Sequence, residues 1–150
     1  MNYEYEYPRP ALAVDLLIFR GASSPRELLL IERKHDPFAG RWALPGGFLD
    51  ENETLEEAAS RELLEETGLR VSDDNLCQLK AYSTVDRDPR TRVISVVFVA
   101  NVPAKAELQA GDDAADAKWF RVDELPELAF DHEQIVNDGL SFLVSDAEAL

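Results

Sequence analysis

The chain has 150 residues, enough for one domain that spans residues 1–150 and buries a proper hydrophobic core. Its net charge is −15, from 15 basic and 30 acidic residues, which argues against a nucleic-acid partner because such proteins need a basic face. The composition, 45% hydrophobic and 30% charged, is typical of a soluble globular protein and excludes a disordered chain.

The beginning of the chain indicates no membrane partner. Residues 1–10 lack the basic segment and apolar core of a signal peptide, and the apolar run at residues 11–19 is too short to span a bilayer. A single cysteine, Cys77, fits a reducing compartment and is expected to be a small buried side chain. We therefore expect a cytoplasmic protein. The alternating Tyr3, Tyr5 and Tyr7 form either an edge strand that pairs with a partner or a frayed terminus.

Residue patterns predict strands on both sides of one well-marked helix. The helix begins at Thr54, because Thr54 and Glu57 form a capping box, and it ends at Gly68, a residue that tolerates the left-handed conformation. The predicted strands cover residues 11–19, 28–33, 76–85, 92–101 and 117–122, and a closing helix covers residues 131–146. This order predicts an α+β fold, an α/β/α sandwich in which a mixed sheet lies between helices.

Three glutamates are concentrated on one face of the predicted central helix. At about 100° per residue, Glu62, Glu65 and Glu66 fall within roughly a third of its circumference. Carboxylates crowded in this way repel one another unless a cation joins them, and hard oxygen ligands suit Mg²⁺ or Mn²⁺. The alternative for a glutamate-rich helix is a solvated acidic face, and the glycines and Arg61 around these residues favour the metal site.

The stretch from Gly47 to Leu69, GFLDENETLEEAASRELLEETGL, matches G-x5-E-x7-R-E-U-x-E-E-x-G-U, where U is aliphatic. On this motif the chain resembles the Nudix hydrolases, Mg²⁺-dependent enzymes that cut a diphosphate joined to another moiety. The preceding WALPGG is similar to the lead-in of this family, in which the glycine before the motif gives a backbone carbonyl to a metal. The resemblance thus implies metal binding and catalysis by Glu62, Glu65, Glu66 and the carbonyl of Gly46, with Glu53 as a further candidate for the cation shell.

The same resemblance implies the other catalytic roles. Arg61 orients the carboxylates through its planar guanidinium rather than touching substrate. The general base is either a glutamate of the motif or an acid on a later loop, where Asp112 and Asp113 are the candidates; a solvated aspartate-rich turn is the alternative for that loop. Both histidines, His35 and His132, are expected to have structural roles.

Basic residues outside the motif are the candidates for substrate contacts. They form two clusters, before and after the motif, from which we select Arg33, Arg41, Arg87 and Arg90. Residues 82–98 resemble the corresponding segment of prokaryotic ADP-ribose pyrophosphatases and of ADP-ribose-sensing domains in regulators of NAD metabolism. The resemblance implies hydrolysis of ADP-ribose to AMP and ribose 5-phosphate. For Arg87, an exposed structural role in its loop is the alternative to a contact with the substrate.

Two other functions fit the same motif. One is a nucleotide-pool sanitising or broad nucleoside diphosphate and triphosphate pyrophosphohydrolase. The other is a non-catalytic ADP-ribose sensor; such regulators carry a basic winged-helix segment after the Nudix domain, which is not found in these 150 residues, and the complete glutamate set also favours catalysis. Because related ADP-ribose pyrophosphatases are commonly dimers, the resemblance further implies a homodimer.

Overall fold

The strands form one mixed sheet, seen in a computed structural model that describes residues 2–21, 25–108 and 114–149. In these ranges the sheet has seven strands, ordered β3-β2-β1-β6-β5, with β4 paired to β1 and β7 paired to β2. The elements are β1 (Ala11–Arg20), β2 (Glu27–Arg33), β3 (Trp42–Ala43), β4 (Gly46–Phe48), α1 (Leu55–Thr67), the 3₁₀ turn η1 (Asp73–Asn75), β5 (Cys77–Tyr82), β6 (Val93–Val102), β7 (Ala114–Arg121) and α2 (His132–Ala149).

The central pair of strands makes the sheet mixed. β1 and β6 run parallel in continuous register, from Ala11 opposite Val93 to Arg20 opposite Val102. The pairings of β1 with β2 and β4, of β2 with β3 and β7, and of β5 with β6 are antiparallel. Since β5 and β6 are antiparallel neighbours, residues 83–92 form a hairpin connection between them.

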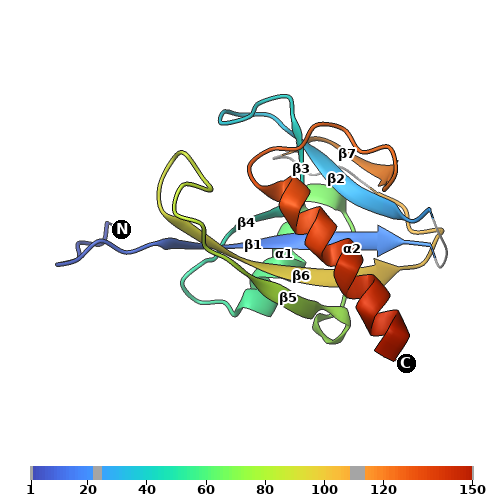
Figure 1. The fold of residues 1–150 in the computed structure, drawn as a ribbon. Helices are drawn as coiled ribbons and strands as arrows, with labels where there is room; N and C mark the ends of the chain where they lie inside the picture. The colour runs from blue at the N-terminus through green and yellow to red at the C-terminus, as the bar shows by residue number, and fades with distance from the viewer. Residues whose placement is uncertain (1, 22–24, 109–113, 150) are drawn as a thin grey trace.

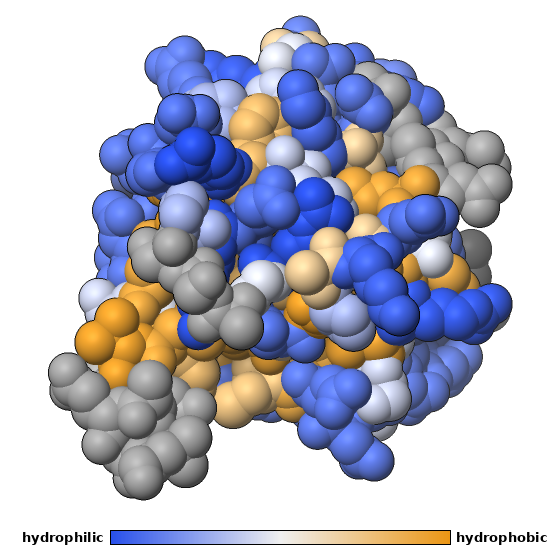
Figure 2. Space-filling model, turned by 90° about the vertical axis from the view of Figure 1, so that its right-hand side faces the viewer, coloured by the Kyte–Doolittle hydropathy of each residue, from blue (hydrophilic) through white to orange (hydrophobic). Residues whose placement is uncertain are grey.

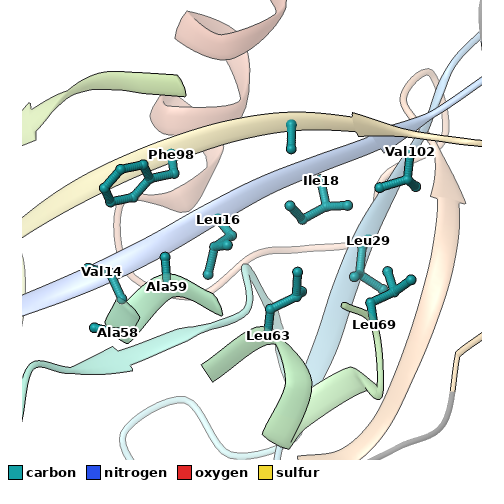
Figure 3. Close-up of a cluster of buried hydrophobic side chains, with 11 residues drawn as sticks. Val14, Leu16, Ile18, Leu29, Ala58, Ala59, Leu63, Leu69, Phe98 and Val102 are labelled. Atoms are coloured by element: carbon teal, nitrogen blue, oxygen red, sulfur yellow. The ribbon is translucent and has the colours of Figure 1, made fainter. Parts of the chain in front are cut away.

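The sheet lies between the two α-helices, with α1 behind it and α2 in front of it in Figure 1. Because successive side chains of a strand point to opposite faces, β1 supplies both cores. Its residues Val14, Leu16 and Ile18 pack with Ala59 and Leu63 of α1 (Figure 3). Leu17 and Phe19 instead join the cluster that contains Ile135 and Val136 of α2. The α/β/α sandwich that the sequence predicts is therefore confirmed.

Both predicted ends of the central helix are present. The hydroxyl of Thr54 accepts a hydrogen bond from the backbone N–H of Glu57 at 3.1 Å, and the Glu57 carboxylate accepts one from the N–H of Thr54 at 3.3 Å. Gly68 has a φ of 76° and its N–H donates to the carbonyl of Leu64 at 2.9 Å. These two caps fix where α1 begins and ends.

Several details of the sequence-based prediction were wrong. The lead-in to the motif contains two short strands, β3 and β4, that no periodic pattern could indicate at lengths of two and three residues. Cys77, expected to be buried, is exposed because it lies on β5, an edge strand. For Tyr3, Tyr5 and Tyr7 the sequence left two alternatives open, and the structure agrees with the frayed terminus: residues 2–10 contain no strand and extend away from the body of the molecule (Figure 1).

Exposed apolar side chains are concentrated at one end of the sheet. They belong to the N-terminal segment, the start of β1, β4 and the β5–β6 loop, which lie at the left of Figure 1; the largest are Tyr3, Tyr5, Tyr7, Leu12, Phe48 and Val85, with Val144 of α2 apart from them. Figure 2 shows the face at the right of Figure 1, where hydrophilic residues predominate and hydrophobic areas are scattered between them. Nowhere in the described ranges is a helix both long enough and apolar enough to cross a membrane.

Candidate active site

The three glutamates of α1 differ strongly in exposure. Glu66 is 6% exposed, whereas the Glu62 and Glu65 side chains are 15% and 48% exposed. The buried carboxylate of Glu66 accepts a hydrogen bond from the backbone N–H of Gly46 at 2.8 Å. This bond joins α1 to the start of β4, so the predicted metal-binding glycine and glutamate are brought into direct contact across 20 residues of sequence.

Two consecutive glycines allow this close approach of β4 to both of its neighbours. A Cβ on Gly46 would lie 2.1 Å from the carbonyl oxygen of Val14 in β1. A Cβ on Gly47 would lie 2.4 Å from a carboxylate oxygen of Glu62 in α1. Since real Cβ atoms do not approach other atoms this closely, a side chain would displace the β1 backbone at Gly46 and the Glu62 side chain at Gly47. Gly47 thus leaves the space that the Glu62 carboxylate occupies against β4, and Gly46 allows β4 to lie against β1.

Arg61 connects the acidic residues of the motif, as the sequence predicts. Its guanidinium donates two hydrogen bonds to the Glu53 carboxylate, at 2.6 and 2.9 Å, and one each to Glu62 at 2.9 Å and Glu65 at 3.3 Å. It also donates to the backbone carbonyl of Phe48 at 3.2 Å. Glu57, the other residue one turn away, is used in the helix cap instead. Arg61 therefore holds carboxylates of α1 against β4.

This network changes the acidity of its members. The hydrogen bonds from Arg61 lower the pKa of Glu53 to about 2, and the hydrogen bond from the backbone of Asp50 lowers it further than pairing alone would. The hydrogen bond to Glu53 raises the pKa of Arg61, against the opposing effect of its partial burial. Glu53 is therefore a charged partner of Arg61 in this structure.

The Glu53–Arg61 pair predicts a defined acid dependence of stability. Because the pKa of Glu53 falls from 4.5 to about 2 on folding, its contribution to the free energy of unfolding is complete above pH 4.5 and lost between pH 4.5 and 2. We expect chemical denaturation to show that Glu53→Gln is less stable than the wild type at pH 6, and that this difference shrinks as the pH falls through that window. Arg61→Gln should abolish the same difference. Wild-type and Glu53→Gln curves that run parallel from pH 6 to pH 2 would contradict the pairing.

A cavity of about 520 Å³, its open mouth included, lies beside the Glu66 carboxylate. It is walled by β1, β2, β3, β4, the β5–β6 loop and the start of α2. Three of the four predicted substrate-binding arginines line it: Arg33, Arg87 and Arg90. The fourth, Arg41, lines a neighbouring cavity and pairs with Glu127 at 3.4 Å. The fold thus places one basic residue from β2 and two from the β5–β6 loop next to the acidic helix.

The arginines of the loop are held in different ways. Arg87 is buried, and it donates two hydrogen bonds, at 2.7 and 2.9 Å, to the carboxylate of Asp131. Arg90 remains 43% exposed, is paired with Asp88 at 2.8 Å, and its guanidinium lies 5.3 Å from the ring centre of Phe48 and 5.6 Å from that of Phe130. Arg87 is therefore not the exposed loop arginine that the sequence allowed, and Arg90 is the one that faces solvent at the cavity.

The cavity also contains polar residues that the sequence analysis did not select. Asp15 is buried in β1, accepts a hydrogen bond from Ser95 at 2.5 Å, and has its pKa raised by burial. His132, buried at the start of α2, has its pKa lowered by burial. The sequence signal was the single acid within the apolar run at residues 11–19. The position of His132 beside Asp15 depends on how α2 packs.

The donor atoms on α1 and β4 fit a small divalent cation. They are carboxylate and carbonyl oxygens, the ligands that Mg²⁺ and Mn²⁺ prefer. No cluster of three or more His, Cys, Asp or Glu side chains that could hold a metal occurs in the described ranges. Mg²⁺ does not need such a cage, because it is usually bound by one or two carboxylates, water and substrate phosphates. The predicted base candidates Asp112 and Asp113 lie outside the described residues.

Comparison with known proteins gives the family. The model of the NUDIX domain matches residues 9–138. The chain is 51% identical over 132 residues to an ADP-ribose pyrophosphatase of Methanocaldococcus jannaschii, which covers 88% of this chain and 74% of that protein. It is 32% identical to an ADPR responsive transcriptional repressor of Acinetobacter baylyi, where the match covers 92% of this chain but 56% of the repressor. The chain thus spans little more than half the length of that relative.

Solved structures agree with this match. The fold is similar to that of a MutT/nudix family protein from Enterococcus faecalis, with a TM-score of 0.87 and 33% identity over 96% of this chain and 66% of the other. It is also similar to the NUDIX domain of Shewanella oneidensis NrtR complexed with ADP ribose, with a TM-score of 0.85 and 30% identity over 95% of this chain and 94% of the other. The complete motif, its placement on α1 and these likenesses show that the chain belongs to the Nudix family.

Proposed function

We propose that the protein hydrolyses the diphosphate of ADP-ribose, with Mg²⁺ as the metal and Mn²⁺ as a substitute. The observation that carries this proposal is the juxtaposition of Glu66 with a cavity lined by Arg33, Arg87 and Arg90. An acidic helix alone repels a diphosphate, and an arginine cluster alone binds one without cutting it. Side by side, they supply a metal-binding edge and a phosphate-binding edge for one substrate.

The substrate is inferred from the relatives. A protein named ADP-ribose pyrophosphatase is 51% identical to this chain, and a Nudix domain of similar fold has been solved with ADP ribose bound. The products would be AMP and ribose 5-phosphate: a water oxygen bonds to one phosphorus, and the bond from that phosphorus to the bridging oxygen breaks.

Residues of α1 and β4 would hold the metal. Nudix hydrolases generally use a divalent metal ion, and the residues that would bind it here are Glu62, Glu65, Glu66 and the backbone carbonyl of Gly46. Such an ion lowers the pKa of a bound water and offsets the charge that develops on the bridging oxygen. Arg61 keeps the carboxylates of Glu62 and Glu65 directed to this edge.

Arginines at the other edge would bind the anionic substrate. Arg90 is the exposed one: its planar guanidinium is held in place by the Asp88 carboxylate and is 43% exposed, so it would be within reach of a phosphate or ribose oxygen. Arg33 lines the cavity from β2, with its Nε donating to the carbonyl of Pro37 at 2.7 Å. Arg87, committed to Asp131, shapes the loop that carries Arg90.

A substrate panel tests the proposal. We expect the kcat/KM of the purified protein in Mg²⁺ to be at least about tenfold higher for ADP-ribose than for NADH, dinucleoside polyphosphates or nucleoside triphosphates. Chromatography should identify AMP and ribose 5-phosphate as the products.

Other outcomes of the panel would support the alternative functions. A preference for nucleoside triphosphates would replace the proposal with the sanitising function, which a relative of 34% identity, the putative 8-oxo-dGTP diphosphatase of Bacillus subtilis, makes worth including. Tight binding of ADP-ribose without cleavage in either metal would indicate a sensor.

A further inference from the structure

A group of buried polar side chains lies on the α2 side of the sheet, beneath the cavity. His132 is 4% exposed, Asp15 8% and Ser95 0%. The Nε2 atom of His132 lies 3.6 Å from one carboxylate oxygen of Asp15, and the Ser95 hydroxyl donates to the other at 2.5 Å. Burying such a group is costly unless its polar atoms are hydrogen-bonded, and a satisfied network of this kind holds its members rigidly.

The hydrogen bonds of His132 determine its tautomer. The backbone N–H of Leu44 donates to Nδ1 of His132 at 3.0 Å, so Nδ1 carries no proton. The ring proton is then on Nε2, the nitrogen that faces Asp15. His132 thus connects a carboxylate of β1 to the backbone of the segment that leads into β4.

That segment leads into β4, whose two glycines contact the predicted metal-binding glutamates Glu62 and Glu66. Leu44 is two residues before Gly46, whose N–H donates to Glu66. The carbonyl of the intervening Pro45 accepts a hydrogen bond from the N–H of Leu16 at 2.9 Å. The backbone from residue 44 to residue 46 is therefore held by β1, by α1 and, through His132, by α2. Only the last of these three contacts comes from the opposite face of the sheet.

The same group reaches the substrate side of the cavity. Arg87 lies 3.9 Å from the Asp15 carboxylate and is held by Asp131, the residue before His132. The start of α2 consequently fixes two parts at once: Leu44 through His132, and the β5–β6 loop through Asp131.

We propose that His132 is a positioning residue that acts through the Leu44 amide, placing Gly46 and Gly47 so that Glu62 and Glu66 face the metal. The inference rests on the proposed function only in taking these glutamates as metal ligands. It assigns no contact with substrate to His132. The essential feature of His132 is its Nδ1 acceptor for the Leu44 N–H, rather than the volume of the ring or the contact of Nε2 with Asp15.

Two substitutions of equal polarity separate these features. In His132→Asn, the amide oxygen takes the place of Nδ1 and still accepts from Leu44. In His132→Gln, the amide nitrogen of the longer side chain takes the place of Nε2 and keeps the contact with Asp15. The N–H of Leu44 is then left without an acceptor. Both remove the imidazole, so each is the control for the other.

We expect His132→Gln, but not His132→Asn, to loosen the site. In His132→Gln, hydrogen exchange of the Leu44 amide should be at least about tenfold faster, and Mn²⁺ affinity measured by calorimetry without substrate should fall by about 10–100-fold, as for other residues that orient metal ligands. With ADP-ribose, kcat should fall by a similar factor and KM should change by less than about threefold. His132→Asn should stay within about threefold of the wild type in exchange and Mn²⁺ affinity.

Equal losses in the two variants, or none in either, would overturn the inference. If His132→Gln does not fold, the wild-type protein still decides it: NMR on uniformly ¹⁵N-labelled protein should show a scalar coupling across the hydrogen bond from the Leu44 nitrogen to Nδ1 of His132, and its absence overturns the proposal. The exchange, Mn²⁺ and coupling measurements use no ADP-ribose. A protein that fails to cut ADP-ribose would thus refute the proposed function without deciding the role of His132.

Discussion

Glu66→Gln is expected to abolish nearly all Mg²⁺-dependent hydrolysis while leaving the fold intact. The substitution keeps a side-chain oxygen that can accept the hydrogen bond from the Gly46 N–H, so the contact between α1 and β4 survives. What is lost is a negative charge at the only one of the three glutamates that is buried beside the cavity. We expect kcat to fall by about 10³-fold, equivalent to roughly 4 kcal/mol of transition-state stabilisation.

The matched control for this variant is Glu56→Gln on the same helix. Glu56 lies in the first turn of α1 and outside the residues that line the cavity. Steady-state kinetics with saturating Mg²⁺ and circular dichroism on both variants separate loss of charge at the site from loss of charge on the helix. If Glu66→Gln keeps more than about a tenth of the wild-type kcat, Glu66 is not a metal-binding residue of this protein.

The second large effect is expected from Gly47→Ala, in contrast to Gly46→Ala. At Gly47 the added Cβ meets the carboxylate of Glu62, the far end of a flexible side chain, which can move away at little cost to the fold. The Glu62 carboxylate is then displaced from its position against β4. A displacement of about 1 Å in a catalytic group can lower the rate by about 10²-fold. We expect Gly47→Ala to lose activity to this extent while its melting temperature stays close to that of the wild type.

At Gly46 the added Cβ meets the backbone carbonyl of Val14, and β1 cannot move without disturbing the core. Gly46→Ala should therefore be destabilised by about 1–3 kcal/mol in chemical denaturation, the usual cost of overpacking a core. The two neighbouring substitutions are thus expected to differ: Gly47→Ala loses activity and keeps its stability, whereas Gly46→Ala loses stability. Equal stability losses in both would show that Glu62 does not yield as the geometry requires.

The central helix was predictable because its determinants are local. The capping box at Thr54 and the left-handed Gly68 each act within a few residues, and both are present in the structure. The five longer strands, β1, β2, β5, β6 and β7, were predicted from their residue patterns. The short strands β3 and β4 were not, since they exist only through pairing with β2 and β1.

The substrate side shows where local information ends. Arg33, Arg41, Arg87 and Arg90 look alike in sequence, yet Arg41 lies at another cavity and Arg87 is buried against Asp131. Their difference depends on the path of the β5–β6 loop and on the start of α2, which lie 44 residues apart where Arg87 meets Asp131. No spacing rule reports a contact over that separation.

By itself, the sequence determined the family, the reaction type and the set of glutamates, because the motif from Gly47 to Leu69 is one continuous stretch whose helix forms by local rules. Only the tertiary structure decided what surrounds them. Parallel pairing of β1 with β6 buries Asp15 beside Ser95, and the docking of α2 places His132 against Leu44. These contacts join four distant segments, and they form because the two helices can bury their apolar faces only on opposite sides of one sheet.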